Sequence, residues 1–250
     1  MTAKKHKITR NFTLVELLVV IVIISIILSM VAPAFRRLMV GNSVDSAARM
    51  VSSQLMLARA EAIARRRYVA VIMPATIDVP SSNTEVYKYQ AFRSAYVSGS
   101  GSNWTLGEWV PGTQWTFLPS GAVIAAIDDD HGSIEYNSTT NEWEVVSDWT
   151  PTDNCATVGD RKHKEDPDNP DSDDVLDAPI IEGVSTNSNI RAVIFKPNGR
   201  ALNREYITIM EGICMDNSNS ASIERSNQNN INVIEINAYT GQARYIYTGR

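Results

Sequence analysis

Cysteine and histidine are scarce in this 250-residue chain, which has two of the former and three of the latter. The zincin helix, the nucleophile elbow, the phosphate-binding loop and the paired-cysteine metal signature are all missing from the sequence. Two cysteines also exclude a disulfide framework of the kind that stabilises small secreted domains. We therefore expect no enzyme activity, no catalytic residue and no cofactor.

Positively charged residues are few beyond residue 40. This part of the chain has 17 Lys and Arg and 27 Asp and Glu, which gives a net charge of -10. Such a field repels the phosphates of nucleic acids. Arg204, Arg225, Arg244 and Arg250 are the residues from which a local basic patch for DNA could form. The overall charge nevertheless predicts that nucleic acid is not a partner.

One long apolar run stands out, because residues 12–35 contain a single charge, Glu16. As a helix this run would extend roughly 36 Å, against about 30 Å for the hydrocarbon core of a bilayer. Four basic residues precede the run and two follow it, which predicts a cytoplasmic N-terminus and an exported remainder. A carboxylate inside such a segment is costly, so Glu16 is a functional candidate.

Two simpler interpretations of this run stay open. A secretory signal peptide also has a basic start and an apolar stretch, and Ala32-Pro33-Ala34 could serve as its cleavage site. Its apolar region is usually only about 7 to 15 residues long, however, and has no use for an acid at its head. A generic single-pass anchor, with Glu16 near the lipid headgroups, is the other alternative.

The segment at residues 11–20, NFTLVELLVV, resembles the cleavage and methylation segment of type IV pilins and type II secretion pseudopilins. The resemblance implies that a prepilin peptidase cuts between Asn11 and Phe12 and methylates the new amine of Phe12. It further implies that Glu16 pairs with such an amine on a neighbouring subunit when the helices assemble into a filament. The implied partners are other pilins or pseudopilins, the peptidase and an inner-membrane assembly platform.

One position departs from the family pattern, because Asn11 stands where the family nearly always has glycine. Glycine reaches backbone conformations that other residues resist, although asparagine is among the residues most often found at positive φ. Slow or absent cleavage is therefore a second hypothesis beside normal processing.

Helical patterning continues past the apolar run, where apolar residues recur at three- and four-residue steps: Val44, Ala47, Ala48, Val51, Leu55, Ala58 and Ala62. We expect one helix over residues 12–66, interrupted at Pro33, which should kink it, and at Gly41. Residues 57–63, LARAEAI, and the strand-like 68–73, YVAVIM, resemble the minor H-type pseudopilins and the FimT-like minor pilins.

From residue 68 the pattern becomes strand-like, with short β-branched and aromatic runs between turn residues. Strands are predicted at residues 68–73, 86–93, 113–118, 122–127, 133–136, 142–146, 191–195, 206–210, 231–237 and 243–247. Turns are predicted at 197–199 and 239–241, and residues 194–200 and 234–244 resemble the tail of the H-type family. The fold class is thus α+β, with a long N-terminal helix packed on an antiparallel β-sheet head.

Four parts follow from this division: a cytoplasmic leader at 1–11, a transmembrane or filament-core helix at 12–35, an amphipathic helix at 36–67 and a β-rich head at 68–250. Residues 98–103 are predicted to be a flexible loop and residues 150–189 an acidic surface insertion. The insertion contains five aspartates whose spacing loosely suggests calcium: Asp166, Asp168, Asp171, Asp173 and Asp174. They lack the glycine and the distal glutamate of an EF-hand, so solvated acids are the simpler interpretation.

The two cysteines, Cys155 and Cys214, would both lie in the exported part of the chain. An even count there permits one disulfide, and two thiols are the alternative.

The sequence predicts a minor pseudopilin of a type II secretion system, which assembles into or caps a short periplasmic filament and so helps to export proteins. It would be a single-pass protein of the bacterial inner membrane, with its C-terminal domain in the periplasm or in the filament. A FimT-like minor type IV pilin, active in pilus assembly or DNA uptake, and a generic anchored exported protein are the alternatives.

Overall fold

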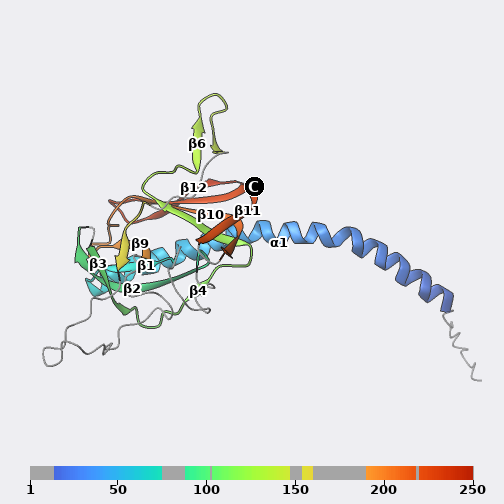
Figure 1. The fold of residues 1–250 in the computed structure, drawn as a ribbon, viewed down its shortest axis with the longest axis horizontal. Coiled ribbons are helices and arrows are strands. Elements are labelled where there is room, and N and C mark those ends of the chain that lie inside the picture. Colours follow the sequence, from blue (N-terminus) through green and yellow to red (C-terminus); the bar gives the residue numbers. More distant parts are fainter. Residues whose placement is uncertain are drawn as a thin grey trace, which may run out of the picture. The chain divides into compact units, whose positions relative to one another are not determined.

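The computed structural model describes residues 14–74, 88–101, 103–146, 154–159, 190–217 and 220–249. The chain divides into two compact units, Met1–Met39 and Val40–Arg250. The second unit is the β-rich head, drawn in Figure 1 with the end of the helix inside it.

A single helix, α1, runs from Leu14 to Arg65, within two residues of the predicted bounds. Its assigned helical structure includes Pro33 and Gly41, so the expected interruptions are absent, whereas the kink at Pro33 stays a prediction. Within the described residues, no helical segment has the length and hydropathy needed to cross a membrane.

The part of α1 in the head buries one stripe of small and branched side chains. The predicted stripe is confirmed, because each of its members is at most 2% exposed: Val44, Ala47, Ala48, Val51, Leu55, Ala58 and Ala62. Four alanines in this stripe keep the helix surface narrow, so strands can approach it closely. The stripe forms the main core together with residues of two separate sheets.

The helix ends at a residue in the left-handed conformation, Arg66, with φ of 53°. The backbone N–H of Arg67 donates to the carbonyl of Ala62 at 3.3 Å, which is the bond of a Schellman cap. Arg67 then pairs with Glu108 at 2.7 Å and stacks on the ring of Tyr96. The chain therefore turns directly from the helix into the first strand.

The larger sheet has six strands in the order β1-β9-β8-β3-β2-β4, and β1 also pairs with β2. Its members are β1 (Val69–Ile72), β2 (Ala91–Ser100), β3 (Asn103–Trp109), β4 (Thr116–Phe117), β8 (Thr157–Gly159) and β9 (Ile190–Phe195). Because β1 pairs with both β2 and β9, the five strands β1, β9, β8, β3 and β2 close into a ring. Alternate residues of all five strands form the second core cluster, among them Ile72, Trp104 and Ile194.

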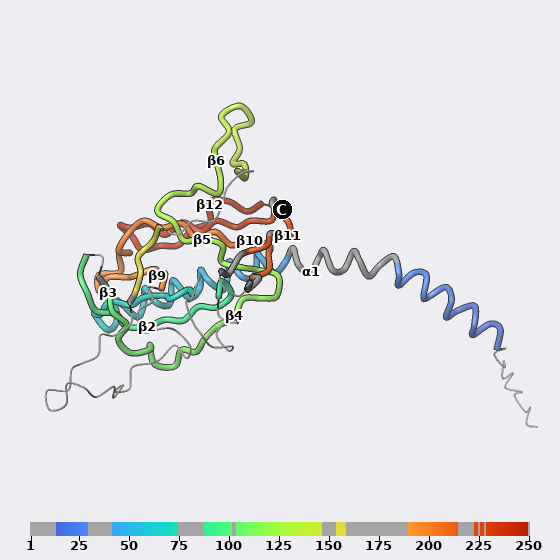
Figure 2. The backbone as a smooth tube through the Cα atoms, viewed as in Figure 1, coloured from blue at the N-terminus to red at the C-terminus, as the bar shows by residue number. Residues whose placement is uncertain are grey.

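The smaller sheet has four antiparallel strands in the order β12-β11-β10-β5. They are β5 (Ala122–Asp128), β10 (Glu205–Asn217), β11 (Ser220–Ile236) and β12 (Ala243–Thr248). One face of this sheet packs on α1, and the other carries the third core cluster beneath a hairpin of β6 (Ile134–Asn137) and β7 (Glu142–Val145). Figure 2 shows this hairpin standing out from the head.

Most predicted strands are confirmed, but the expectation of a flexible loop at residues 98–103 was wrong. Strand β2 extends to Ser100, Gly101 follows in a turn and β3 begins at Asn103, with Ser98 opposite Thr105 and Gly99 opposite Trp104. The indole N–H of Trp104 also donates to the carbonyl of Gly101 at 2.9 Å, which closes the turn. Inside the expected insertion, β8 pairs with β9 and runs parallel to β3, so the head is not purely antiparallel.

We predict that Gly241→Ala destabilises the head strongly. Gly241 has φ of 64°, and a Cβ there would lie 2.0 Å from the carbonyl oxygen of Gly199. Strain and steric overlap together should lower the free energy of unfolding by more than about 2 kcal/mol. Urea denaturation of the detergent-solubilised chain, followed by tryptophan fluorescence, measures this change.

Gly112→Ala is the matched control, because Gly112 has φ of 78° but open space where the Cβ would lie. Only the conformational strain of about 1 kcal/mol should appear there. Equal decreases in the free energy of unfolding of Gly241→Ala and Gly112→Ala would show that the close approach of Gly241 to Gly199 contributes nothing to stability.

Candidate functional site

The first described turns of α1 present an apolar surface with one acid. Glu16 lies in the first turn, where a negative charge is favoured by the helix dipole. The large apolar side chains from Leu14 to Leu28 are between 46% and 81% exposed within the chain. The hydroxyls of Ser25 and Ser29 donate to the carbonyls of Ile21 and Ile26, both at 2.7 Å, so these polar groups are satisfied within the helix. This surface is suited to an apolar environment.

A shallow groove runs along α1 inside the head. It consists of two adjoining hollows of about 330 and 340 Å³ that share Gln54, Leu57 and Thr116. The helix supplies one wall, from Ser46 to Glu61, and the opposite wall is formed by strand and loop residues between Phe92 and Thr116. Leu57 remains 64% exposed in this groove, which leaves a large apolar side chain uncovered.

Two charged residues lie at opposite ends of the groove, Arg49 and Glu61. Glu61 accepts hydrogen bonds from the Tyr96 hydroxyl at 2.5 Å and from Arg65 at 3.2 Å. The bond from Tyr96 is the main reason that the pKa of Glu61 lies below its usual value. The Arg49 side chain, at the other end, is exposed.

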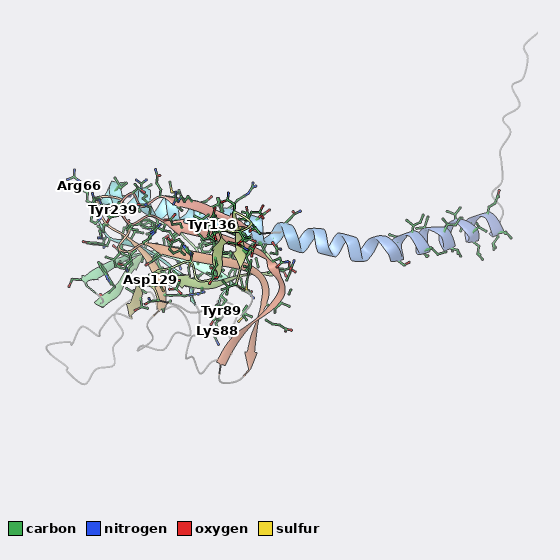
Figure 3. The ribbon with its side chains drawn as sticks, turned by 90° about the horizontal axis from the view of Figure 1, so that it is seen from above. Arg66, Lys88, Tyr89, Asp129, Tyr136 and Tyr239 are labelled. Atoms are coloured by element: carbon green, nitrogen blue, oxygen red, sulfur yellow. The ribbon has the colours of Figure 1, made fainter. Side chains whose placement is uncertain are left out.

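The far end of α1 meets the two predicted turns of the C-terminal region. Arg59 Nε donates to the carbonyls of Gly199 and Thr240, both at 3.0 Å. Gly199 is buried against Ile63, so close that a Cβ would lie 2.6 Å from Ile63 Cδ1. Figure 3 shows Tyr239, from the second turn, at the same end of the head as Arg66. This helix–turn junction joins the helical and C-terminal segments that carry the family resemblance.

Two of the arginines considered for DNA contact, Arg204 and Arg244, bind the same buried carboxylate. Arg204 lies 2.5 Å from Glu235 and Arg244 pairs with its other oxygen, while Glu235 itself is 1% exposed. Burial raises the pKa of Glu235, but the hydrogen bonds from Arg244 and Arg204 outweigh it, so the pKa lies below its usual value. These two arginines stabilise the small sheet.

A buried arginine that the sequence analysis missed links the two sheets. Arg191, on β9, donates from Nε to the carbonyl of Met73 at 2.8 Å and from Nη2 to the carbonyl of Ile124, on β5, at 2.7 Å. Its guanidinium also lies 5.1 Å from the ring centre of Tyr89. No spacing rule could have identified it, because β9 otherwise reads as an ordinary apolar strand.

Glu205, at the start of β10, was also missed. It is 1% exposed, and its Oε1 accepts a hydrogen bond of 3.5 Å from the backbone N–H of Ala156. Its other oxygen has no hydrogen-bond partner among the described residues. Burial raises the pKa of Glu205 to about 8, although the bond from Ala156 opposes this rise.

The predicted disulfide is not formed in the structure, which records Cys155 and Cys214 as thiols. Cys155 packs against the main core, between α1 and the sheets, whereas Cys214 packs against the third cluster. These two clusters occupy opposite faces of the four-stranded sheet, so the sheet separates the sulfur atoms.

Several predicted site residues lie outside the described residues or have no described side chain. Asn11, Phe12, Arg250 and the five aspartates at 166–174 belong to the first group, and Pro33 and Arg225 to the second. Across the described ranges, no group of His, Cys, Asp or Glu could hold a metal ion.

Comparisons with known proteins bear on the class of protein. Residues 47–150 match the family model for Type II transport protein GspH. Two solved structures of the minor pseudopilin EpsH from the type 2 secretion system of Vibrio cholerae are similar to this chain at 12% identity, with TM-scores of 0.36 and 0.37. They cover 83% and 84% of this chain and 98% of their own, and at such values they carry no further argument. No curated protein matches the chain.

The family match covers the head end of α1 and the strands as far as β7. It confirms the resemblance to the pilin and pseudopilin class that the sequence indicated. Within that class, residues 47–150 are similar to Type II transport protein GspH.

We predict that Glu205 makes the free energy of unfolding fall as pH rises from about 4.5 to about 8. Across that window the unfolded chain has lost the Glu205 proton, while the folded chain retains it because burial raises the pKa. Glu205→Gln should remove this dependence and be more stable than the parent chain by roughly 4 kcal/mol at pH 8. Denaturant unfolding at a series of pH values measures it.

Glu235→Gln is the control on the neighbouring strand. The pKa of Glu235 is lowered by its two arginines, so removing its charge should destabilise the protein at pH 8 instead. If Glu205→Gln and Glu235→Gln changed the free energy of unfolding in the same direction at pH 8, the environments assigned to the two carboxylates would be contradicted.

Proposed function

We propose that this protein is a minor pseudopilin that joins or caps a short filament of a type II secretion system. The observation that carries the proposal is the apolar helix surface from Leu14 to Leu28 with Glu16 in its first turn. Burying this surface against lipid or other helices is favourable at about 25 cal/mol per Å². The similarity of residues 47–150 to Type II transport protein GspH supports a role in type II secretion.

Membrane storage before assembly is part of this proposal. The chain would cross the bacterial inner membrane once, with residues 12–35 in the bilayer, the leader in the cytoplasm and the head in the periplasm. The positive charges before the run and the satisfied hydroxyls of Ser25 and Ser29 support it. Other pseudopilins, the prepilin peptidase and the assembly platform would be its partners, and it would catalyse no reaction itself.

The DNA-uptake alternative gains no support from the described arginines. Arg204 and Arg244 share Glu235, so the carboxylate compensates one of their two positive charges. The head as a whole carries the acidic excess noted above. We therefore keep secretion as the proposed role.

We predict that the prepilin peptidase cuts the chain between Asn11 and Phe12. Mass spectrometry of the membrane-extracted protein should show a methylated N-terminus at Phe12. Asn11→Gly is the control that restores the family residue and should give the same product at an equal or higher yield. An N-terminus at Met1 or Thr2 in the parent chain would contradict cleavage.

We predict that Glu16→Leu leaves the protein in the membrane and reduces its incorporation into filaments at least about tenfold. Replacing the acid removes a charge that is costly in lipid, whereas assembly needs that charge to set the register between subunits. Fractionation measures membrane insertion, and the amount recovered in sheared or cross-linked filaments measures incorporation. Ser25→Leu is the control, since it alters the same helix without removing a charge. Normal incorporation of Glu16→Leu would count decisively against the proposed role of Glu16.

A further inference from the structure

The helix–turn junction is a basic surface on an acidic head. The three segments that form it are residues 62–67, at the end of α1, and the turns at 196–200 and 237–241. Together they contain five Lys and Arg and no Asp or Glu, whereas acids outnumber bases in the chain beyond residue 40. Positive charge is therefore concentrated at this end of the head.

Three of these five cations have no carboxylate partner within the part of the chain that the structure describes. Arg65 pairs with Glu61 at 3.2 Å, and Arg67 pairs with Glu108 at 2.7 Å. The ion pairs of the described residues do not include the other three cations, which are Arg66, Lys196 and Arg200. The side chains of Arg66 and Arg200 are exposed and that of Lys196 is half-buried. These positive charges can therefore pair with acids of another molecule.

The backbone of Arg66 indicates an external role for its side chain. Its φ of 53° is the left-handed conformation that glycine usually provides after a helix end. An arginine adopts this conformation only at an energetic cost, and such strained residues cluster at functional sites. The Arg66 side chain forms no hydrogen bond, ion pair or ring contact with the described residues that would offset the cost. A contact outside this chain would explain why an arginine stands there.

Two exposed apolar side chains lie among these charges. Tyr239 is 78% exposed, and Ile63, which contacts Gly199, is 44% exposed. The turn that carries Tyr239 is rigid, because Asn237 Oδ1 accepts from the backbone N–H of Tyr239 at 2.9 Å and Arg59 holds the carbonyl of Thr240 at 3.0 Å. Tyrosine and arginine are enriched among the residues that dominate binding at protein interfaces, and a rigid surface loses little freedom on binding. The junction thus has the composition of a protein-binding surface.

The acidic charge of the rest of the head limits which anions can bind at the junction. A nucleic acid duplex or an anionic bilayer carries negative charge over a large area, so it would also meet the acidic excess around the basic surface. A short acidic polypeptide segment can contact the basic surface alone. Its apolar side chains can also cover Ile63 and Tyr239, which phosphate groups cannot do.

We propose that the helix–turn junction binds an acidic polypeptide segment of another protein. Carboxylates of this segment pair with Arg66, Lys196 and Arg200, and its apolar side chains contact Ile63 and Tyr239. The proposal concerns the head alone, so it does not rest on the roles proposed for Glu16 or for cleavage of the leader.

Fluorescence anisotropy with the detergent-solubilised full-length chain tests the proposal. The probe is a labelled decapeptide of Asp and Glu with two central Leu residues, and the control peptide has Asn and Gln in place of the acids. Arg200→Glu should weaken binding of the acidic peptide at least about tenfold, because a like charge then opposes it. Arg49→Glu is the matched control, since it makes the same charge change at an exposed site elsewhere on α1. Equal weakening by both variants, or equal binding of the two peptides, would overturn the proposal.

Arg66→Gly separates binding from folding. Glycine favours the left-handed conformation, so the urea midpoint of unfolding should stay unchanged or rise. Affinity for the acidic peptide should nevertheless fall at least about threefold, because one positive charge is lost. An affinity equal to that of the parent chain would contradict the part assigned to Arg66 and, with it, the proposed surface.

Competition distinguishes a polypeptide partner from other anions. A DNA duplex and micelles containing phosphatidylglycerol are each supplied at the same concentration of negative charge as unlabelled acidic peptide. Both should displace the labelled peptide less than the unlabelled peptide does. Stronger displacement by the duplex would assign the surface to nucleic acid, and stronger displacement by the lipid would assign it to a membrane, so either result overturns the proposal.

Discussion

The fold depends on the narrow stripe that α1 presents to the head. Alanines at positions 47, 48, 58 and 62 let strands of both sheets approach one helix. This helix therefore organises two sheets that share no strand. Arg191 joins the sheets directly, since it donates to carbonyls of residues in both regions of the head. A larger side chain in the stripe would push the two sheets apart and would break both hydrogen bonds that Arg191 donates.

Arg59 extends the same constraint to the C-terminal turns. It holds the carbonyls of Gly199 and Thr240, while the glycines at 199 and 241 allow the turns to approach the helix and each other. The segments whose sequences resemble H-type pseudopilins thus meet at one place, although about 140 residues separate Arg59 from Gly199. The resemblance therefore coincides with a packing requirement of the head.

Helices and strands that follow a regular spacing of apolar residues could be predicted from the sequence. Contacts between residues that lie far apart in the chain could not. The buried stripe of α1 and most strands follow directly from apolar spacing. The hairpin at residues 98–103 was missed because serine and glycine usually indicate a loop, whereas backbone pairing with β3 and the packing of Trp104 decide the conformation there. Glu205, Glu235 and Arg191 were missed because burial of a charged side chain depends on what other strands place beside it.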